Sequence, residues 1–268
     1  MSFVHLHTHS PFSFLDGGST LEELLQQTVE LGMPALALTD HNNLSGAVKF
    51  QRLAKEKGVK PVIGVELTLE GDFHLVLLAQ NPAGYSNLCR LISKAHLNNE
   101  RLKPKALFQD LQAHQEGLFA LSGCRKGEIS YLILHGRYQE ALQAAKKYID
   151  IFGGRFFLEA QGDLLPGFSG LLKSMAELAE YLKVGLVATN NVHFTRKEDF
   201  PAHDLLTCVR TLTSLDSVHP ERRLNRENYL KSAEEMARIF RLYPKAISNT
   251  LKIASECAES LELNRTLF

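Results

Sequence analysis

Val4-His5-Leu6-His7-Thr8-His9-Ser10, close to the amino terminus of this 268-residue chain, combines an apolar strand pattern with alternating histidines. Because successive side chains of a strand point to opposite faces, His5, His7 and His9 are expected on one face. Two imidazoles at this spacing at a strand end can bind one metal ion through neutral ring nitrogens. Asp16 follows after a short loop that could return its carboxylate to the same ion. The alternative is a strand whose polar histidines lie on a solvated face.

The composition is that of an ordinary soluble globular protein, with 44% hydrophobic and 22% charged residues. The 30 lysines and arginines are balanced by 30 aspartates and glutamates, which argues against a protein that coats nucleic acid, since such proteins carry excess cations. The four cysteines are scattered without a C-x-x-C pair, so neither a zinc ribbon nor a disulfide framework is indicated. With no apolar run of transmembrane length and no signal peptide, the chain is expected in the cytoplasm and away from membranes.

Strand and helix patterns alternate along most of the chain, and helix signals alone continue after residue 198. A capping box of the form Ser-x-x-Glu is expected at Ser19 to Glu22, at the start of the first helix. Strands are predicted at 4–7, 35–39, 60–69, 73–79, 118–122, 156–160 and 184–189. Helices are predicted at 21–31, 45–57, 85–97, 128–134, 138–152, 168–182, 232–240 and 244–261. A further short helix is predicted to end at about residue 113.

This alternation predicts an α/β fold with a mostly parallel sheet, either a barrel or a doubly wound sheet. Polar residues fall at or just after the carboxyl ends of several predicted strands. The active sites of barrels gather at those ends, whereas a doubly wound sheet concentrates its site near one switch point. We therefore expect a distorted barrel that carries a helical extension at its carboxyl end.

Each candidate residue has a plain structural reading when it is taken alone. His41 could cap the next helix, His96 could be a polar helix end, and Cys124 could be a small buried side chain. Glu66 lies in an apolar strand, where an unpaired carboxylate would cost several kcal/mol, so a metal or cation partner is favoured. His5 can be read as a hydrogen-bonded core histidine. The remaining histidines are interpreted as surface or structural residues, namely His74, His114, His135, His203 and His219.

Taken together, these positions form a series of short motifs. They are His7-x-His9, Phe12-Ser-x-Leu15-Asp16-Gly17, Thr39-Asp40-His41, Gly64-Val65-Glu66, Ser93-x-Ala95-His96, Ser122-Gly123-Cys124 and Thr189-Asn190-Asn191-Val192-His193. From residue 3 to about residue 195 the series resembles the PHP (polymerase and histidinol phosphatase) domain. It is most similar to the PHP domains of bacterial DNA polymerase III alpha subunits and their error-prone paralogues. The resemblance implies a (β/α)7-like, TIM-like barrel over residues 1–200 and a helical extension over residues 201–268 that leads toward a polymerase core.

The resemblance also implies a cluster of up to three divalent metal ions, with zinc or manganese favoured and iron a further candidate. One position departs from the family pattern, which ends in Asp-x-His where this chain has Asn191. An amide offers a carbonyl oxygen but no negative charge, so we expect at least one weaker metal site, with metal binding retained and catalysis in question. The implied metal-binding positions are His7, His9, Asp16, His41, Glu66, His96, Cys124, Asn191 and His193.

Three functions follow from the resemblance. The first is a metal-dependent phosphoesterase that acts as a 3′–5′ exonuclease on a DNA 3′ end, in which metal-activated water attacks the phosphate. Arg125 and Lys126, just after Cys124, could bind the phosphate or could be two solvated turn residues. The second is a structural module of a replicative polymerase that docks a proofreading exonuclease subunit and the polymerase core. The third is a free-standing phosphatase of the histidinol phosphatase type. The apolar end at residues 263–268 suggests a cut within a longer polypeptide, and no polymerase palm or fingers sequence is present.

Overall fold

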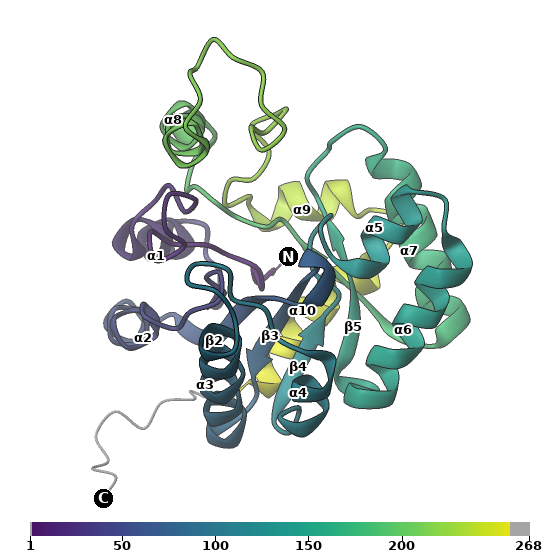
Figure 1. Cartoon of the computed structure of the whole chain (residues 1–268). Coiled ribbons are helices and arrows are strands. Elements are labelled where there is room, and N and C mark those ends of the chain that lie inside the picture. The colour runs from purple at the N-terminus through teal and green to yellow at the C-terminus, as the bar shows by residue number, and fades with distance from the viewer. Residues whose placement is uncertain (1, 258–268) are drawn as a thin grey trace, which may run out of the picture.

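The computed structural model describes residues 2–257 and contains a curled sheet of six strands, arranged in chain order (Figure 1). All residues of the first and fourth strands are buried, as expected where both faces of a sheet are covered. The predicted α/β class is confirmed, and the sheet forms a curled half-barrel. The strands are β1 (Ala35–Leu38), β2 (Lys60–Thr68), β3 (His74–Ala79), β4 (Leu118–Leu121), β5 (Phe156–Gln161) and β6 (Gly185–Thr189).

Strand β3 is the antiparallel strand in a sheet that is otherwise parallel, as expected. It runs antiparallel to both β2 and β4, whereas β1 and β2, β4 and β5, and β5 and β6 are parallel pairs. A short 3-10 turn, η1 (Glu70–Asp72), joins β2 to β3, and its central Gly71 has φ 80°. A parallel pair would need a crossover of a dozen or more residues, so this connection can form only an antiparallel pair. His74, the first residue of β3, is therefore paired with Thr68 at the carboxyl end of β2.

The amino-terminal segment lies between the two edges of the sheet. His5 forms a parallel bridge with Leu36 of β1, and Thr8 forms one with Val192, just past β6. The backbone N–H of His9 donates to the carbonyl of Val192 over 2.8 Å. A strand was predicted at 4–7, and the structure has isolated β-bridges at His5 and Thr8 in this segment. They bring the histidine segment to the point where the sheet curls back on itself.

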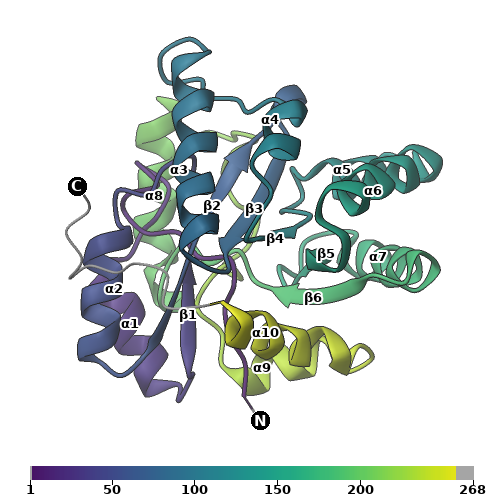
Figure 2. The same cartoon turned by 90° about the horizontal axis from the view of Figure 1, so that it is seen from below.

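Helices surround this sheet (Figure 2). α1 and α2 lie beside β1, α5 to α7 lie beyond β4 and β5, and α10 packs against β6. The helices are α1 (Leu21–Glu30), α2 (Ala47–Glu56), α3 (Pro82–Leu97), α4 (Phe108–Ala113), α5 (Glu128–Leu134), α6 (Tyr138–Phe152), α7 (Phe168–Leu182), α8 (Phe200–Thr211), α9 (Ala233–Ile239) and α10 (Pro244–Glu256), with short 3-10 turns η2 (Gly153–Arg155) and η3 (Lys197–Asp199).

The capping box of α1 is shifted by one residue from its predicted position. Thr20 is the N-cap, and its side chain accepts from the backbone N–H of Glu23, whose carboxylate accepts from the backbone N–H of Thr20. Ser19 instead accepts from the backbone N–H of Thr195 over 2.9 Å. The reason is that the helix begins at Leu21, which makes Thr20 and Glu23 the N-cap and N3 residues.

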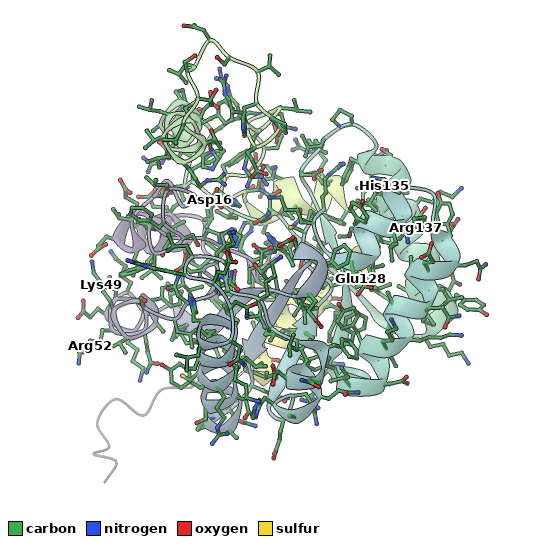
Figure 3. All side chains as sticks on the ribbon, in the orientation of Figure 1. Asp16, Lys49, Arg52, Glu128, His135 and Arg137 are labelled. Atoms are coloured by element: carbon green, nitrogen blue, oxygen red, sulfur yellow. The ribbon has the colours of Figure 1, made fainter. Side chains whose placement is uncertain are left out.

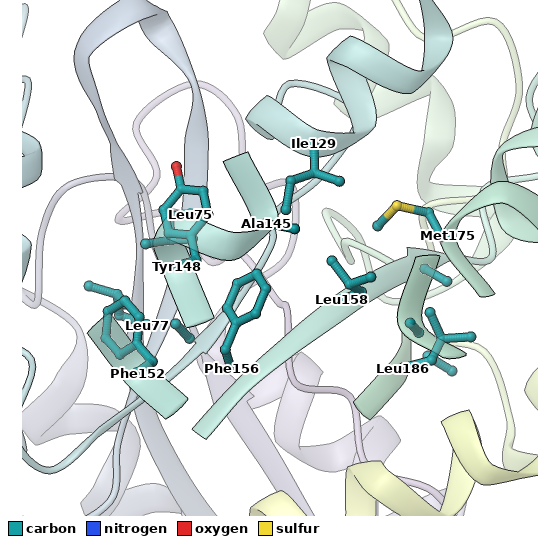
Figure 4. Close-up of a cluster of buried hydrophobic side chains, with 14 of the residues drawn as sticks. Leu75, Leu77, Ile129, Ala145, Tyr148, Phe152, Phe156, Leu158, Met175 and Leu186 are labelled. Carbon is teal, nitrogen blue, oxygen red and sulfur yellow. The ribbon is translucent and has the colours of Figure 1, made fainter. Parts of the chain in front are cut away.

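A continuous apolar core packs the outer helices against the sheet (Figure 4). Leu75 and Leu77 of β3 lie beside Tyr148 and Phe152 of α6, and Phe156 begins β5 nearby. All five side chains are almost fully buried, and each contributes about 1.5–3 kcal/mol of hydrophobic stabilisation. This packing fixes the strands whose carboxyl ends carry the polar residues.

Three predicted helices, at 128–134, 138–152 and 168–182, match α5, α6 and α7 residue for residue. The last predicted helix agrees with α10 as far as Glu256, and its expected end at residue 261 lies outside the described residues. Across residues 2–257, none of the helices has the length and apolar character that crossing a membrane would require.

Candidate metal centre

A cavity of about 510 Å³ opens at the edge of the sheet where the predicted metal-binding residues gather. Its floor includes Asp16, His41 and Glu66, and its wall includes residues of α8 and of the loop 212–228 that follows it. Figure 1 shows α8 and this loop above the sheet, and Figure 3 shows Asp16 below α8, whereas Arg52 and Arg137 lie at the outside of the molecule. The cavity is therefore built from both the predicted barrel and the predicted extension.

Glu66 is the centre of the floor. Its Oε1 lies 3.3 Å from Nε2 of His7 and 3.1 Å from Nδ1 of His74. Its Oε2 lies 2.9 Å from Nδ1 of His41 and 3.5 Å from Nε2 of His9. A carboxylate that is 1% exposed thus faces four imidazoles. This arrangement is stable only where positive charge is held between these groups, since a buried anion without a partner costs several kcal/mol.

Asp16 joins a second pair of histidines. Its Oδ2 lies 3.0 Å from Nε2 of His41 and 3.0 Å from Nε2 of His193, so His41 bridges the two carboxylates. The loop can return this side chain because Gly17 packs directly on the backbone of Ser10. A Cβ atom at position 17 would lie 1.9 Å from the Ser10 carbonyl oxygen. Only glycine allows this close approach.

The orientation of His7 is set by a second buried carboxylate. Nδ1 of His7 donates to Oε1 of Glu159 over 2.7 Å, and the Thr189 hydroxyl donates to the same oxygen over 2.6 Å. With its proton on Nδ1, a neutral His7 directs the Nε2 lone pair at Glu66. A carboxylate behind a histidine is the usual arrangement for a metal ligand, because it fixes the tautomer and raises the basicity of the ring.

His9 is oriented through a hydroxyl. The Ser13 hydroxyl donates its proton to Asp40 over 2.7 Å, so its oxygen accepts from Nδ1 of His9 over 3.0 Å. The Nε2 lone pair of His9 then faces Oδ1 of Asn191 at 3.1 Å. In this orientation two acceptors face each other, and a bound cation would satisfy both. Asn191 can present its amide here because it adopts φ 45°, a left-handed conformation that asparagine tolerates well.

Protons hold part of this charge when no metal is bound. Burial disfavours the charged form of His7, but Glu159 and Glu66 outweigh it and raise its pKa to about 10. The same opposition raises the pKa of His41 to about 9, through Glu66 and Asp16. It raises the pKa of His74 to about 10, through Glu66 and Cys124. Burial and the nearby guanidinium of Arg223 instead lower the pKa of His193 to about 4.

The donor atoms fit divalent metal ions. Nε2 of His7 and Oε1 of Glu66 are buried, face each other and have no hydrogen-bond partner among residues 2–257. Imidazole nitrogens, carboxylate oxygens and a thiol form a mixed donor set that suits zinc, manganese or iron better than magnesium. Three overlapping groups bring their donor atoms within 4.8 Å of one another: His7, His9 and Glu66; His41, Glu66 and His74; and His9, His41 and His193.

The structure brings most of the predicted positions together. Cys124 belongs to the same site, because its Sγ lies 3.5 Å from Nδ1 of His74 and it lines the cavity. His5 points elsewhere and its Nε2 contacts the backbone carbonyl of Lys231 at 2.9 Å. The positions that surround Glu66 and Asp16 or line the cavity are His7, His9, His41, Cys124, Asn191 and His193.

His96 is the one predicted metal-binding position that the structure places away from the cluster. It is exposed at the carboxyl end of α3, where its Nε2 contacts the carbonyl of Asn42 at 2.9 Å. It belongs to none of the three ligand groups found in residues 2–257. The direction of α3 explains this, because the helix leaves the sheet after β3 and ends outside the cavity. His74 instead lies in the cluster, within the potential ligand group of His41 and Glu66.

Sequence reasoning missed two residues of the centre, His74 and Glu159. His74 stands at the beginning of a strand, and the beginning of a parallel strand would lie at the opposite edge of the sheet. The signal was the short connection from β2 to β3, which forces an antiparallel pair. Glu159 lies within the apolar run Phe156-Phe157-Leu158-Glu159-Ala160. A buried carboxylate in such a strand is itself a sign of a charged partner.

The two predicted phosphate-binding residues differ in their surroundings. Arg125 donates to Asp163 from Nε over 2.6 Å and to the Pro166 carbonyl from Nη1 over 3.1 Å. Lys126 makes one partner contact, from Nζ to Glu221 at 3.2 Å. Both line the cavity. Of the two, Lys126 has the more accessible cationic head group.

Comparison with known proteins agrees with this geometry. The sequence profile of the PHP domain matches residues 5–163. The error-prone DNA polymerase of Symbiobacterium thermophilum is 52% identical over 283 aligned residues, which span 100% of this chain and 26% of that protein. The DNA polymerase III alpha subunits of Thermus aquaticus and Escherichia coli are 39% and 35% identical over 98% and 97% of the chain, and 23% of each relative is covered. The chain thus spans about a quarter of the length of these relatives.

The fold also matches a solved structure from Bifidobacterium adolescentis, a protein with a suggested metal-dependent phosphoesterase activity. The TM-score is 0.51 at 15% identity, and the match covers 72% of this chain and 87% of that one. At this identity the match supports the architecture alone. The ordered motifs, the strand-end cluster and the match over residues 5–163 show that the chain belongs to the PHP domain family.

Proposed function

We propose that the chain is a metal-dependent phosphoesterase that hydrolyses phosphodiester bonds at a DNA 3′ end. The observation that carries this proposal is the set of three overlapping ligand groups on the floor of one cavity, with cationic side chains at its mouth. Up to three divalent ions would have ligands here, and the donor set suits zinc or manganese. When bound, such ions would supply Lewis acidity that activates water and stabilises the charge of the phosphate.

The chain's own residues would prepare the site for this chemistry. Glu66 and Asp16 supply the fixed negative charge. Glu159 and Ser13 hold His7 and His9 with a lone pair directed inward. Lys126 would contact the phosphate from the cavity mouth, and Arg125, held by Asp163, would add positive charge beside it. We assign no side chain as a general base.

A DNA substrate is proposed because the relatives over this chain are DNA polymerases of about four times its length. In that setting the further partner would be the rest of a polymerase polypeptide, in the cytoplasm. We keep residues 1–200 as the barrel and residues 201–268 as an extension, although α8 and its loop contribute to the cavity. The same long polymerase relatives argue against a free-standing phosphatase of the histidinol phosphatase type.

The second candidate function is a structural module that docks a proofreading exonuclease subunit and the polymerase core, with weak or no hydrolysis. One observation favours it. Asn191 is a neutral amide at a ligand position where the family pattern has a carboxylate. A site with less negative charge holds clustered cations less well.

The experiment that separates the two is metal analysis of protein purified without chelator, combined with hydrolysis of a single-stranded DNA with a labelled 3′ end in manganese or zinc buffer. Bound metal together with metal-dependent loss of the 3′ nucleotide supports the phosphoesterase. Bound metal without hydrolysis supports the docking module. Protein that binds no metal under any condition contradicts the metal centre itself.

A further inference from the structure

One wall of the cavity carries arginines that lie beside the potential ligand groups of the metal centre. Arg210 comes from α8, and Arg222 and Arg223 come from the loop 212–228. This wall lies outside residues 5–163, the part that matches the family profile. Its three arginines differ in what they contact, and that difference separates a structural role from a binding role.

The guanidinium of Arg222 donates its hydrogen bonds to α8 and to the loop 212–228 itself. Its Nε and Nη2 donate to the two carboxylate oxygens of Asp204 over 2.8 and 2.6 Å. Its Nη1 donates to the carbonyls of Leu215 and Ser217 over 2.8 and 2.6 Å. These contacts use four of the five N–H donors of the guanidinium. Arg222 therefore fixes the loop against α8 and makes the wall a defined surface.

Arg223 is tethered at one end and contacts the metal centre at the other. Its Nη1 donates to Oδ1 of Asn228 over 3.0 Å, and its Nη2 lies 2.8 Å from Nε2 of His193. Nη2 also lies 3.1 Å from Nδ1 of His193, so the guanidinium contacts both ring nitrogens and packs over the imidazole. Nε2 of His193 also lies 3.0 Å from Oδ2 of Asp16. Arg223 thus holds a positive charge directly beside the metal centre, while Asn228 keeps the guanidinium at the rim.

Arg210 and Lys126 meet at a carboxylate across the cavity mouth. Nη1 of Arg210 and Nζ of Lys126 lie 3.4 and 3.2 Å from Glu221, and Nη2 of Arg210 lies 3.4 Å from Oδ1 of Asp16. These contacts are longer than the 2.7–2.9 Å of a strong charge-assisted hydrogen bond. Cations from opposite walls therefore converge loosely on one anionic group, next to the metal centre.

We propose that Arg210 and Arg223 bind the non-bridging oxygens of a substrate phosphate, and that Glu221 occupies this position until the phosphate displaces it. The inference rests on the proposed phosphoesterase function and deepens it. The ligand class is a phosphate monoester or a terminal phosphodiester. Guanidinium groups suit this ligand because they donate two parallel hydrogen bonds to a phosphate. The wall outside residues 5–163 then supplies substrate recognition, and the barrel supplies the metal ligands.

The test measures binding rather than turnover. Protein saturated with Mn²⁺ is titrated with inorganic phosphate and with deoxyadenosine 5′-monophosphate by calorimetry, and Mn²⁺ affinity is measured separately. Arg210→Gln and Arg223→Gln are each expected to weaken phosphate binding about tenfold. Glu221→Gln is expected to strengthen it severalfold. Arg223→Gln is also expected to bind Mn²⁺ at least as tightly as the wild type, because a positive charge beside His193 has been removed.

Arg226→Gln is the matched control, since Arg226 is an exposed arginine of the same loop that lies over the ring of Phe200 and is not among the cavity-lining residues. Equal phosphate affinity in the Arg223 and Arg226 variants overturns the inference. So does a manganese-loaded wild type that binds no phosphate, although its bound metal would still support the metal centre. If Arg223→Gln does not fold, Arg223→Lys replaces it, and phosphate affinity equal to that of Arg226→Lys overturns the inference.

Discussion

Nδ1 of His7 lies 2.7 Å from Oε1 of Glu159, although 152 residues separate the two in the sequence. The contact crosses from the amino-terminal segment to β5 and is buried at both ends. Glu159 therefore decides which ring nitrogen of His7 is available to the metal centre. The carboxylate also accepts from Thr189, so its position depends on β6 as well.

Glu159→Gln should weaken metal binding by about tenfold to a hundredfold, the usual effect of losing the carboxylate behind a ligating histidine. Glutamine keeps the size and one acceptor, so the fold should be retained and the loss should come from the missing charge. Competition of Zn²⁺ binding against a chromophoric chelator gives the affinity. Glu128→Gln is the control, because Glu128 accepts from Tyr148 and does not line the cavity. Equal zinc affinity in the two variants would contradict the role of Glu159.

A pair of histidine substitutions tests whether His74 or His96 is a metal ligand. His74→Ala should lower the metal content per chain, because His74 faces Glu66 at 3.1 Å. His96→Ala should leave the metal content unchanged, because His96 is exposed and its Nε2 contacts the Asn42 carbonyl outside the cluster. Elemental analysis of both purified variants against the wild type is sufficient. The reverse result, with metal lost on changing His96 alone, would restore the original assignment.

The sequence was most informative where local chemistry determined the outcome. The helices α5, α6 and α7 were predicted to the residue, because apolar periodicity and Gly boundaries define them. Predicted positions at the cavity such as His41, Glu66 and Cys124 were found because they lie at or just past the carboxyl ends of strands. His74 and Glu159 were missed for a different reason. Their roles depend on strand direction and on a contact between distant segments, which no local pattern encodes.

The cavity wall shows the same limit. The sequence from residue 198 onward indicated helices and loops, yet it did not indicate that Arg223 would reach His193. That contact depends on the loop 212–228 being held by Arg222 and Asp204. Long-range ion pairs of this kind have no periodicity that can be read from a sequence. The order of the motifs was sufficient to predict the family but not the substrate-facing wall.

Metal binding should release protons and should become tighter as pH rises. The pKa values of His7, His41 and His74 are raised to about 10, 9 and 10, so all three are protonated at pH 7.5 when no metal is bound. A ligating imidazole must lose its proton first. The apparent affinity should therefore rise between about pH 6.5 and pH 9. Titration calorimetry at pH 7.5 in two buffers of different ionisation enthalpy measures the protons released. Identical heats in both buffers would contradict this prediction.

Removal of metal should lower thermal stability. A ligand that binds only the native state stabilises it by about 2.7 kcal/mol at a hundred times its dissociation constant. Chelation should therefore lower the melting temperature by several degrees, and added Zn²⁺ or Mn²⁺ should restore it. In His9→Ala the shift on chelation should be smaller, since a buried ligand position is already lost. An unchanged melting temperature, in protein shown beforehand to contain metal, would count against this centre.

Asn191→Asp tests whether charge limits the third metal. Asp16, Glu66 and a Cys124 thiolate offer three negative charges at the cavity, and Glu159 adds a fourth behind His7. Burial raises the pKa of the Cys124 thiol, so its charge depends on the metal itself. Several divalent ions held close together repel one another strongly, and each carboxylate among them offsets part of that repulsion. The wild type should therefore hold two metals tightly or a third one weakly, and hydrolyse DNA slowly or not at all.

An aspartate at this position can adopt the same backbone conformation, φ 45°, because left-handed aspartate is nearly as well tolerated as asparagine. Its carboxylate would lie beside Nε2 of His9, where the amide oxygen now lies at 3.1 Å. We expect Asn191→Asp to raise metal stoichiometry or affinity, and also the initial rate on a single-stranded DNA 3′ end. Both are measured in one manganese buffer, with Asn98→Asp at an exposed helix end as the control. A wild type that already holds three metals and cleaves as fast as the variant would show that charge at position 191 is not limiting.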